Sequence, residues 1–282
     1  MVYILFDIGG TKTRIGVSFD GKRLGKVKII PTSRDAKGGI AVLKSIAEEL
    51  TGGKKIKAIC GGIAGSFDRR KSVIVGGGGN IKGWVGKPLK VMLERKFHAS
   101  VYLENDAALT GLGEAVCGAG RGKEIIAYFT ISTGFGGVRV VKDKIDASAR
   151  GFEPTYLIID IGGKLCRKCR GKDIGAHLSG KGIFEHFHKD PKKIKGQKIK
   201  NNLALFLAIG LHNAIAFWSP DIFVIGGPVM NIISMDRVRT HLKKLYHGAL
   251  PPPPIKKAAL GDFGSLHGAL IYLQQQRMKK NL

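Results

Sequence analysis

The stretch Phe6-Asp7-Ile8-Gly9-Gly10-Thr11-Lys12-Thr13-Arg14-Ile15-Gly16-Val17 decides the fold, because it sets a carboxylate and a glycine turn between two apolar runs. The runs predict two strands of a hairpin. Adjacent glycines permit positive φ and close backbone approach, Thr11 offers a hydroxyl, and Asp7 can hold a hydrated Mg²⁺. The stretch predicts a loop that grips phosphate groups, although a Gly-Gly turn alone is also typical of an ordinary hairpin.

Two further glycine clusters follow apolar runs that are rich in β-branched residues. Thr133-Gly134-Phe135-Gly136-Gly137 separates residues 125–132 from residues 138–141, which again predicts strand, glycine turn and strand. Gly226-Gly227 ends a buried run that comes after a helical apolar pattern over residues 203–218. Glycine at such a strand end leaves room for a flat ring against the backbone. Two phosphate loops and a place for a base, in this order, indicate an ATP-binding protein.

Asn105 and Asp106 stand between an apolar run and a helical pattern, so we expect them where a strand ends and a helix begins. Asn and Asp also cap the free amides of helix starts, and this explains the pair equally well when it is taken alone. A hydroxyl that attacks a γ-phosphate needs a positioned carboxylate to accept its proton. The neighbouring motifs favour Asp106 as that general base.

In the order of these motifs the chain resembles the ROK family of sugar kinases and related repressors over nearly its whole length. Residues 7–11 resemble the family's first phosphate motif, 133–137 its second, 220–227 its adenosine motif and 261–269 its last nucleotide-side segment. The resemblance implies an α/β fold of two actin-like ATPase (ribonuclease H-like) domains around a central cleft. It also implies ATP and Mg²⁺ as cofactors, with Asp7 near the metal through water. The implied cofactor-binding residues are Asp7, Gly9, Gly10, Thr11, Lys12, Thr133, Gly134, Gly136, Gly137, Gly226 and Gly227.

The resemblance also implies a sugar site. It gives Asp106 the role of base, Asn105 a hydrogen bond to a sugar hydroxyl, and the backbone of the turn at Gly65 a place facing the sugar. Asn80 resembles the family's Asn that contacts a ring hydroxyl, with a plain turn residue as the alternative. Glu153 aligns with a sugar-binding Glu. The implied function is glucokinase-like: transfer of the γ-phosphate of ATP to a hydroxyl of a hexose or N-acetylhexosamine.

The expected zinc motif departs from the family pattern. Where zinc-binding members supply a His and a run of cysteines, this chain has Tyr156 and only Cys166 and Cys169. A structural Zn²⁺ needs four Cys or His ligands, so we do not expect zinc. Cys60 and Cys117 are isolated in sequence, and folding would have to bring such residues close to complete a site.

A second departure concerns the sugar. Gly175 stands where the resemblance predicts a Glu that reads the anomeric end, so recognition of ordinary glucose is in question. His177 could serve as a hydroxyl partner instead, although a helical His is more often interior or solvent-facing. The alternative function is a non-catalytic nucleotide- or polyanion-binding protein. Retention of Asp7, Asp106 and Glu153 favours the enzyme.

Composition sets the outer limits. A chain of 282 residues with 44% apolar and 24% charged residues can bury two cores. We expect an N-terminal domain over residues 1–115, to which residues 266–282 return, and a C-terminal domain over residues 116–265. No apolar stretch reaches the length of about 20 residues that a membrane span needs, and the start has no basic lead. Four cysteines without a paired framework agree with a reducing compartment, so we expect a cytoplasmic protein without membrane insertion.

The motifs described above do not account for the formal net charge of +26. Six lysines gather before the apolar helix pattern: Lys189, Lys192, Lys193, Lys195, Lys198 and Lys200. Charge of this size gives salt-dependent affinity for polyanions, with a merely solvated basic surface as the alternative. No recognition-helix module precedes residue 1, so we expect no sequence-specific DNA binding. The resemblance favours a homodimer.

Overall fold

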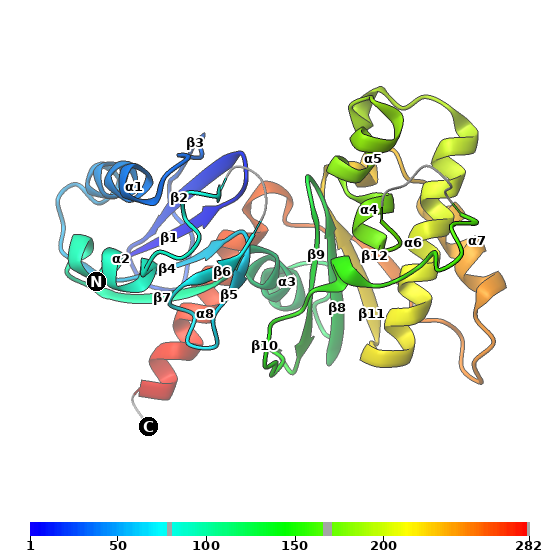
Figure 1. Ribbon diagram of the computed structural model, residues 1–282. Coiled ribbons are helices and arrows are strands. Elements are labelled where there is room, and N and C mark those ends of the chain that lie inside the picture. The colour runs from blue at the N-terminus through cyan, green and yellow to red at the C-terminus, as the bar shows by residue number, and fades with distance from the viewer. Residues whose placement is uncertain (78–80, 166–170, 281–282) are drawn as a thin grey trace. The chain divides into compact units, whose positions relative to one another are not determined.

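The computed structural model of this chain describes residues 1–77, 81–165 and 171–280. The chain forms two compact units (Figure 1). The first unit comprises Met1–Gly118, Ala147–Gly151 and the chain from Leu260 onward, and the second comprises Ala119–Asp146 and Phe152–Ala259. The domain boundaries given above, at residues 115 and 265, stay a prediction.

The first unit is built on a five-stranded mixed sheet in the order β3-β2-β1-β4-β7. Its strands are β1 (Val2–Ile8), β2 (Lys12–Ser18), β3 (Val27–Pro31), β4 (Ile56–Ile63) and β7 (Ser100–Asn105). The first three strands pair antiparallel, and β4 and β7 run parallel to β1. The predicted hairpin around Gly9 and Gly10 is therefore confirmed. Two short strands, β5 (Ser66–Phe67) and β6 (Ile74–Gly76), form a separate antiparallel pair.

Among its described residues the first unit has four α-helices: α1 (Ala36–Thr51), α2 (Leu89–Phe97), α3 (Asp106–Cys117) and α8 (Gly264–Lys280). Asp35 starts α1, because its carboxylate accepts the amide of Gly38 at 2.7 Å, and Gly52 ends it with a φ of 61°. Trp84 is 1% exposed and its indole donates to the carbonyl of Ser33, so it packs in the core.

Helix α8 crosses α3 at glycines, and the two lie side by side in Figure 1. A Cβ on Gly268 would overlap the carbonyl of Leu109, and a Cβ on Gly113 would overlap the carbonyl of Gly264. Only glycine allows the two backbones to approach this closely. The close crossing fixes the segment before α8, which carries Asp262, on the first unit.

The second unit repeats the same plan with a sheet in the order β10-β9-β8-β11-β12. Its strands are β8 (Ile125–Ile131), β9 (Phe135–Val141), β10 (Lys144–Ile145), β11 (Ile222–Gly226) and β12 (Ile255–Lys257). Its helices are α4 (Ile174–Leu178), α5 (Gly180–Phe187), α6 (Gln197–Trp218) and α7 (Met235–Leu245). The central strand β8 pairs antiparallel with β9 and parallel with β11, as β1 does with β2 and β4.

Helix α6 is long and apolar enough to cross a membrane when length and composition alone are considered. Its apolar side chains instead form the core of the second unit, where Leu203, Leu207 and Leu211 are almost fully buried. They pack there with residues of the sheet such as Phe223. This burial explains the composition of α6 as that of a core helix.

We predict that Gly268→Ala lowers the free energy of unfolding by about 3 kcal/mol, because the added methyl group forces α3 and α8 apart. Chemical denaturation measures this change. The matched control is Gly162→Ala, where a Cβ meets only the Lys164 side chain at 3.5 Å or more. Equal stability of the two variants would contradict the tight crossing.

Candidate functional site

The carboxyl ends of the three parallel strands of the first unit meet at one edge of its sheet. Asp7 of β1 stands in register with Gly62 of β4, and Gly62 stands in register with Glu104 of β7. Asn105 and Asp106 follow directly, at the junction of β7 and α3. The structure thus brings together Asp7, Gly65, Asn105 and Asp106, which lie far apart in the sequence.

The loop between β1 and β2 is held from outside by Thr32. The amide of Thr32 donates to the carbonyl of Thr11, and its hydroxyl donates to the carbonyl of Gly9 at 2.8 Å. Gly9 also donates to the carbonyl of Lys12. The amides of Gly10 and Thr11 have no acceptor among the residues that the structure describes. Two unused amides at a loop tip make it suited to bind an anion.

Gly9 and Gly10 permit positive φ, but neither adopts it in this structure. A Cβ on Gly10 would meet nothing within 4 Å in the described part of the chain. Neither strain nor internal packing therefore requires glycine at position 10. The open space beside Gly10 leaves room for a ligand to approach the backbone closely.

Asp7 lies buried, in contact with Arg14 from the opposite strand. Arg14 donates from Nη1 to the Asp7 carboxylate at 2.9 Å and from Nη2 to the Asp262 carboxylate at 3.1 Å. Burial and the charge of Asp106 together raise the pKa of Asp7 to about 7, although Arg14 acts in the opposite direction. The carboxyl group of Asp7 thus sits near the balance between its neutral and charged forms at neutral pH.

Asp106 begins α3 and lies over Gly62. A Cβ added to Gly62 would stand 2.8 Å from the Asp106 Cα and 3.3 Å from the Ser265 hydroxyl. The carboxylate of Asp106 accepts the amide of Ala107 at 2.9 Å. The residue is half-buried, so its carboxylate remains within reach of a substrate. Glycine at position 62 is therefore a condition for the placement of Asp106.

Asn105 serves the fold as well as the site. Its Oδ1 accepts the amide of Ala108 at 3.0 Å, which caps α3, and its Nδ2 donates to the carbonyl of Gly65 at 3.0 Å. The capping explanation of Asn105 is confirmed. One Nδ2 hydrogen and one Oδ1 lone pair remain for a ligand beyond these two bonds.

The corresponding loop of the second unit joins β8 to β9. The carbonyls of Ser132 and Thr133 accept the amides of Gly180 and Lys181 at the start of α5, at 2.7 and 3.1 Å. Gly134 is exposed, and a Cβ there would meet nothing within 4 Å among the described residues. Gly136 and Gly137 lie within β9, in register with Thr130 and Phe129. This loop thus matches the first in having an open glycine at its tip.

Gly226 and Gly227 have an internal reason to be glycine. A Cβ on Gly226 would stand 2.8 Å from the Tyr128 hydroxyl, and one on Gly227 would overlap the backbone of Ile131. Gly227 also adopts a φ of 93°, which other residues rarely adopt. Packing beneath the β8–β9 loop therefore explains both residues without a ligand, and their contact with a base stays a prediction.

The candidate sugar-site residues of the second unit are either exposed at the surface or buried. Glu153 is exposed, and Tyr156 is 71% exposed. A Cβ on Gly175 would overlap the Thr155 hydroxyl, so a side chain at position 175 would require Thr155 to shift. His177 is buried, with Nδ1 2.8 Å from a backbone carbonyl and Nε2 3.5 Å from Asp160. The interior explanation of His177 is the correct one.

Three of the candidate residues, Asn80, Cys166 and Cys169, lie outside the residues that the structure describes. Within the described ranges, no group of three or more His, Cys, Asp or Glu side chains could hold a metal ion. Cys60 is buried in β4, and Cys117 is exposed at the end of α3. The expectation about zinc stays a prediction.

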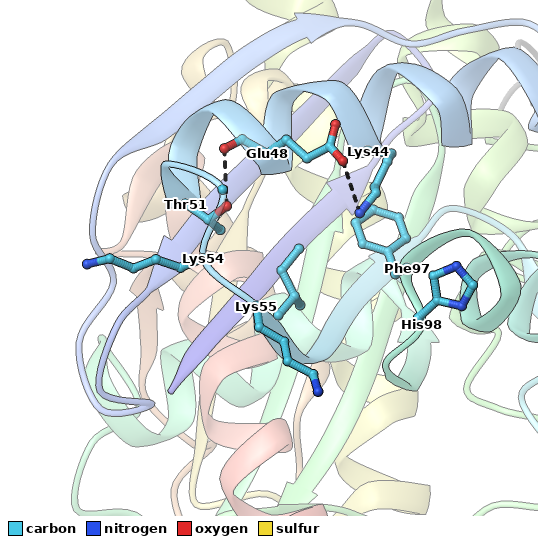
Figure 2. Close-up of a pocket in the computed structure, with 9 residues that line it drawn as sticks. Lys44, Glu48, Thr51, Lys54, Lys55, Phe97 and His98 are labelled. Carbon is cyan, nitrogen blue, oxygen red and sulfur yellow. Dashed lines mark hydrogen bonds and ion pairs between the residues drawn. The ribbon is translucent and has the colours of Figure 1, made fainter.

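A pocket of about 330 Å³ lies away from these residues, where α1 and α2 end (Figure 2). Lys44 pairs with Glu48 there at 3.2 Å, and its ammonium stands 5.3 Å from the centre of the Phe97 ring. Figure 2 shows that Lys54, Lys55 and His98 do not converge on one point. The ends of two helices present carbonyl groups, which disfavour an anion. This pocket is therefore not the candidate site.

Sequence reasoning missed the side chains that hold the site together. The sequence pattern places Arg14 only within an expected strand, and Asp262 and Ser265 only within the segment over residues 261–269. The position of Arg14 opposite Asp7 in the hairpin was a usable signal, because cross-strand partners share a face of the sheet. No local pattern connects Arg14 with Asp262, which lies 248 positions further along the chain.

We predict that the apoprotein loses stability through Asp7 as pH rises. Its folded pKa, about 7, lies above its ordinary value of 3.8, so the folded state binds the proton more tightly. This contribution is complete below pH 3.8 and lost as pH passes through about 7. Asp7→Asn should therefore gain stability relative to wild type across this window, by at most about 4 kcal/mol.

Denaturant titrations with a chelator at several pH values measure the difference between the two proteins. The control is Asp236→Asn, whose side chain is 91% exposed and which should show no such trend. A stability difference for Asp7→Asn that is independent of pH would contradict the raised pKa.

Comparison with known proteins places this geometry in context. The model of the ROK family matches residues 3–276. A protein of uncharacterised function from Clostridium perfringens is 30% identical over 250 residues, covering 81% of this chain and 82% of that protein. An N-acetyl-D-glucosamine kinase from Escherichia fergusonii is 27% identical over 316 aligned positions, covering 95% and 98%.

Two solved structures are similar over nearly the whole chain. A ROK hexokinase from Thermus thermophilus has a TM-score of 0.81 at 28% identity, covering 98% of this chain and 100% of that one. A ROK family glucokinase from Streptomyces griseus, in complex with glucose and AMPPNP, has a TM-score of 0.78 at 23% identity, with the same coverage. The repeated mixed sheet is thus the expected actin-like ATPase fold, and the chain belongs to the ROK family.

Proposed function

We propose that this protein is an ATP-dependent carbohydrate kinase that phosphorylates a hydroxyl of a hexose or N-acetylhexosamine. The observation that carries the proposal is the strand-end cluster of the first unit. Two carboxylates, Asp7 and Asp106, lie there close enough for one charge to raise the pKa of the other, beside a loop with two unused amides. The kinase names of the relatives from Escherichia fergusonii and Thermus thermophilus support the same chemistry.

The residues present fit a nucleotide with Mg²⁺. Carboxylate oxygens are the ligands that Mg²⁺ prefers, and Asp7 offers one beside the unused amides of Gly10 and Thr11. Lys12 is exposed next to that loop and free to meet a phosphate. Bound Mg²⁺ would neutralise charge on the phosphates, with Asp7 holding it through water. The glucokinase solved with AMPPNP supports ATP as the donor.

The roles of the remaining cofactor-binding residues are still predictions. They are Gly9 in the first loop, Thr133, Gly134, Gly136 and Gly137 in the second, and Gly226 and Gly227 for the adenosine. The open tip at Gly134 supports a role in phosphate binding. For Gly226 and Gly227, the internal packing described above is a second and sufficient reason for glycine.

Asp106 acts as the general base in this proposal. It takes the proton of the attacking sugar hydroxyl while the oxygen forms its bond to the γ-phosphorus and the bond to the β–γ bridging oxygen breaks. Asn105 has one hydrogen left on Nδ2 to hold a neighbouring sugar hydroxyl. Gly65, Asn80 and Glu153 complete the predicted sugar contacts. The protein's share of catalysis is then alignment and proton acceptance.

The proposed sugar is a hexose whose anomeric end is bound without a carboxylate at position 175. The Thr155 hydroxyl occupies the space that a side chain on Gly175 would need. An N-acetylhexosamine is compatible with the absence of a carboxylate at position 175. The name of the N-acetyl-D-glucosamine kinase relative supports this class of sugar. The competing proposal, a non-catalytic nucleotide binder, is favoured by the exposure of Glu153 and Tyr156. ADP release measured with a panel of hexoses and N-acetylhexosamines separates the two.

We predict that Asp106→Asn lowers kcat by about 10²- to 10⁴-fold while the affinity for ATP changes by only a few fold, because a general base acts on the transition state. Coupled ADP release gives kcat, and calorimetry gives the ATP affinity. The control is Asp20→Asn on the exposed turn after β2, which should retain full activity. Retention of most of kcat by Asp106→Asn would rule out its role as base.

The basic segment over residues 189–200 is a candidate polyanion surface. Five of its six lysines are exposed, and none forms an ion pair with any residue that the structure describes. It continues toward α7, where Arg237 donates to Asn201 at the start of α6. Uncompensated charge of this kind attracts phosphate polymers without sequence preference. The homodimer and the cytoplasmic location stay predictions.

We predict that changing Lys189, Lys192, Lys195 and Lys198 to Glu leaves kcat unchanged and weakens polyanion binding. If four of these lysines contact phosphates, log Kd changes with log salt with a slope of about 3 to 4 in the wild type, and less in the variant. Titration with a random oligonucleotide and with polyphosphate at several salt concentrations measures it. Unchanged slopes would identify the segment as solvated surface, and a lost kcat would place it in the active site.

A further inference from the structure

Lys71 occupies a backbone conformation that lysine rarely adopts. Its φ is 52°, in the left-handed region, at the turn between β5 and β6. Asp68 organises this turn: its carboxylate accepts the amides of Ser72 and Val73, and its carbonyl accepts the amide of Lys71. Glycine would adopt this conformation without strain. The bonds made by Asp68 hold Lys71 in this strained conformation.

The side chain of Lys71 reaches the buried carboxylate of Glu104. The Lys71 ammonium stands 2.6 Å from Glu104 Oε1, and Glu104 is only 4% exposed. The same oxygen accepts the backbone amide of Asn105 at 2.9 Å. Within the described residues no other cation pairs with Glu104. Lys71 therefore compensates a buried charge that lies one residue before Asn105.

The chain at the base of the same hairpin also contacts Asn105 directly. Gly65, directly before β5, accepts a hydrogen bond from the Asn105 side chain through its carbonyl, and its own φ is 115°. A Cβ on Gly65 would stand 2.7 Å from the carbonyl of Gly76. The β5–β6 hairpin is thus joined to the end of β7 at both its base and its tip. Between these two joints lies Asn105, with Asp106 next to it.

We propose that Lys71 and Glu104 form a positioning pair that holds the β5–β6 hairpin against Asn105 and so fixes the sugar-binding geometry. Neither residue contacts the substrate in this proposal. The pair acts through the amide of Asn105 and the carbonyl of Gly65. The inference rests on the proposed kinase function, in which Asn105 and Asp106 meet the sugar.

The principal test is Lys71→Gly, because this change relieves the backbone strain and removes only the charge and the chain that carries it. We expect kcat/KM for the sugar to fall about 10- to 100-fold, mainly through KM, while KM for ATP stays within about twofold. Lys71→Met should lose as much, and Lys71→Arg should restore most of the activity. The double variant Lys71→Met with Glu104→Gln should lose less than the sum of the two single changes.

Lys142→Gly is the matched control. Lys142 also has a left-handed φ of 48° in a hairpin turn, and it pairs with Glu124 at 3.4 Å. Its pair is solvent-exposed and belongs to the second unit. Relief of the same strain there should leave both KM values unchanged. A sugar KM that rises equally in this control would overturn the proposal.

Amide hydrogen exchange tests the pair without turnover. In Lys71→Gly we expect faster exchange at Asn105 and in residues 65–76, with the rest of the first unit unchanged. This result together with an inactive wild type would refute the kinase and keep the positioning pair. Unchanged exchange at Asn105, or a uniform loss of protection across the first unit, would overturn the pair, as would an unaltered sugar KM.

Discussion

The parallel pairing of β1, β4 and β7 is the constraint on which the candidate site depends. Because the three strands run in one direction, their carboxyl ends supply Asp7, Gly62 and Asn105 at one edge. The backbone hydrogen bonds of the sheet hold these positions, so the polar side chains do not have to find one another. A site built in this way rests on a rigid element and leaves only the loops to adapt.

The cost of this arrangement is the burial of charge. Asp7 and Glu104 both lose water at the strand ends. Asp7 pairs with Arg14 from the other strand of its own hairpin, and Glu104 pairs with Lys71 from the β5–β6 hairpin. Removing the cation from either pair leaves an uncompensated buried carboxylate. The two ion pairs differ in their second contact, since Arg14 reaches on to Asp262 and Lys71 does not.

The sequence allowed the prediction of what is local and repeated. The two hairpins, the core helix over residues 203–218 and the helix start at Asp106 followed from apolar patterns and turn residues. It could not show that Gly226 and Gly227 pack against Tyr128 and Ile131, because a glycine looks the same whether it faces a ligand or its own chain. Nor could it connect Lys71 with Glu104, which lie 33 positions apart on elements of two different sheets.

The crossing of α3 and α8 has a consequence for the synthesis of the chain. The first unit draws on residues 1–118 and again on the chain from Leu260 onward, and the whole second unit lies between these two parts. A ribosome therefore releases the whole second unit before it releases the helix that completes the first. Until α8 arrives, the surface of α3 around Leu109 and Gly113 has no cover, and the nascent first unit exposes part of its core. The second unit is the part that can reach its native packing first.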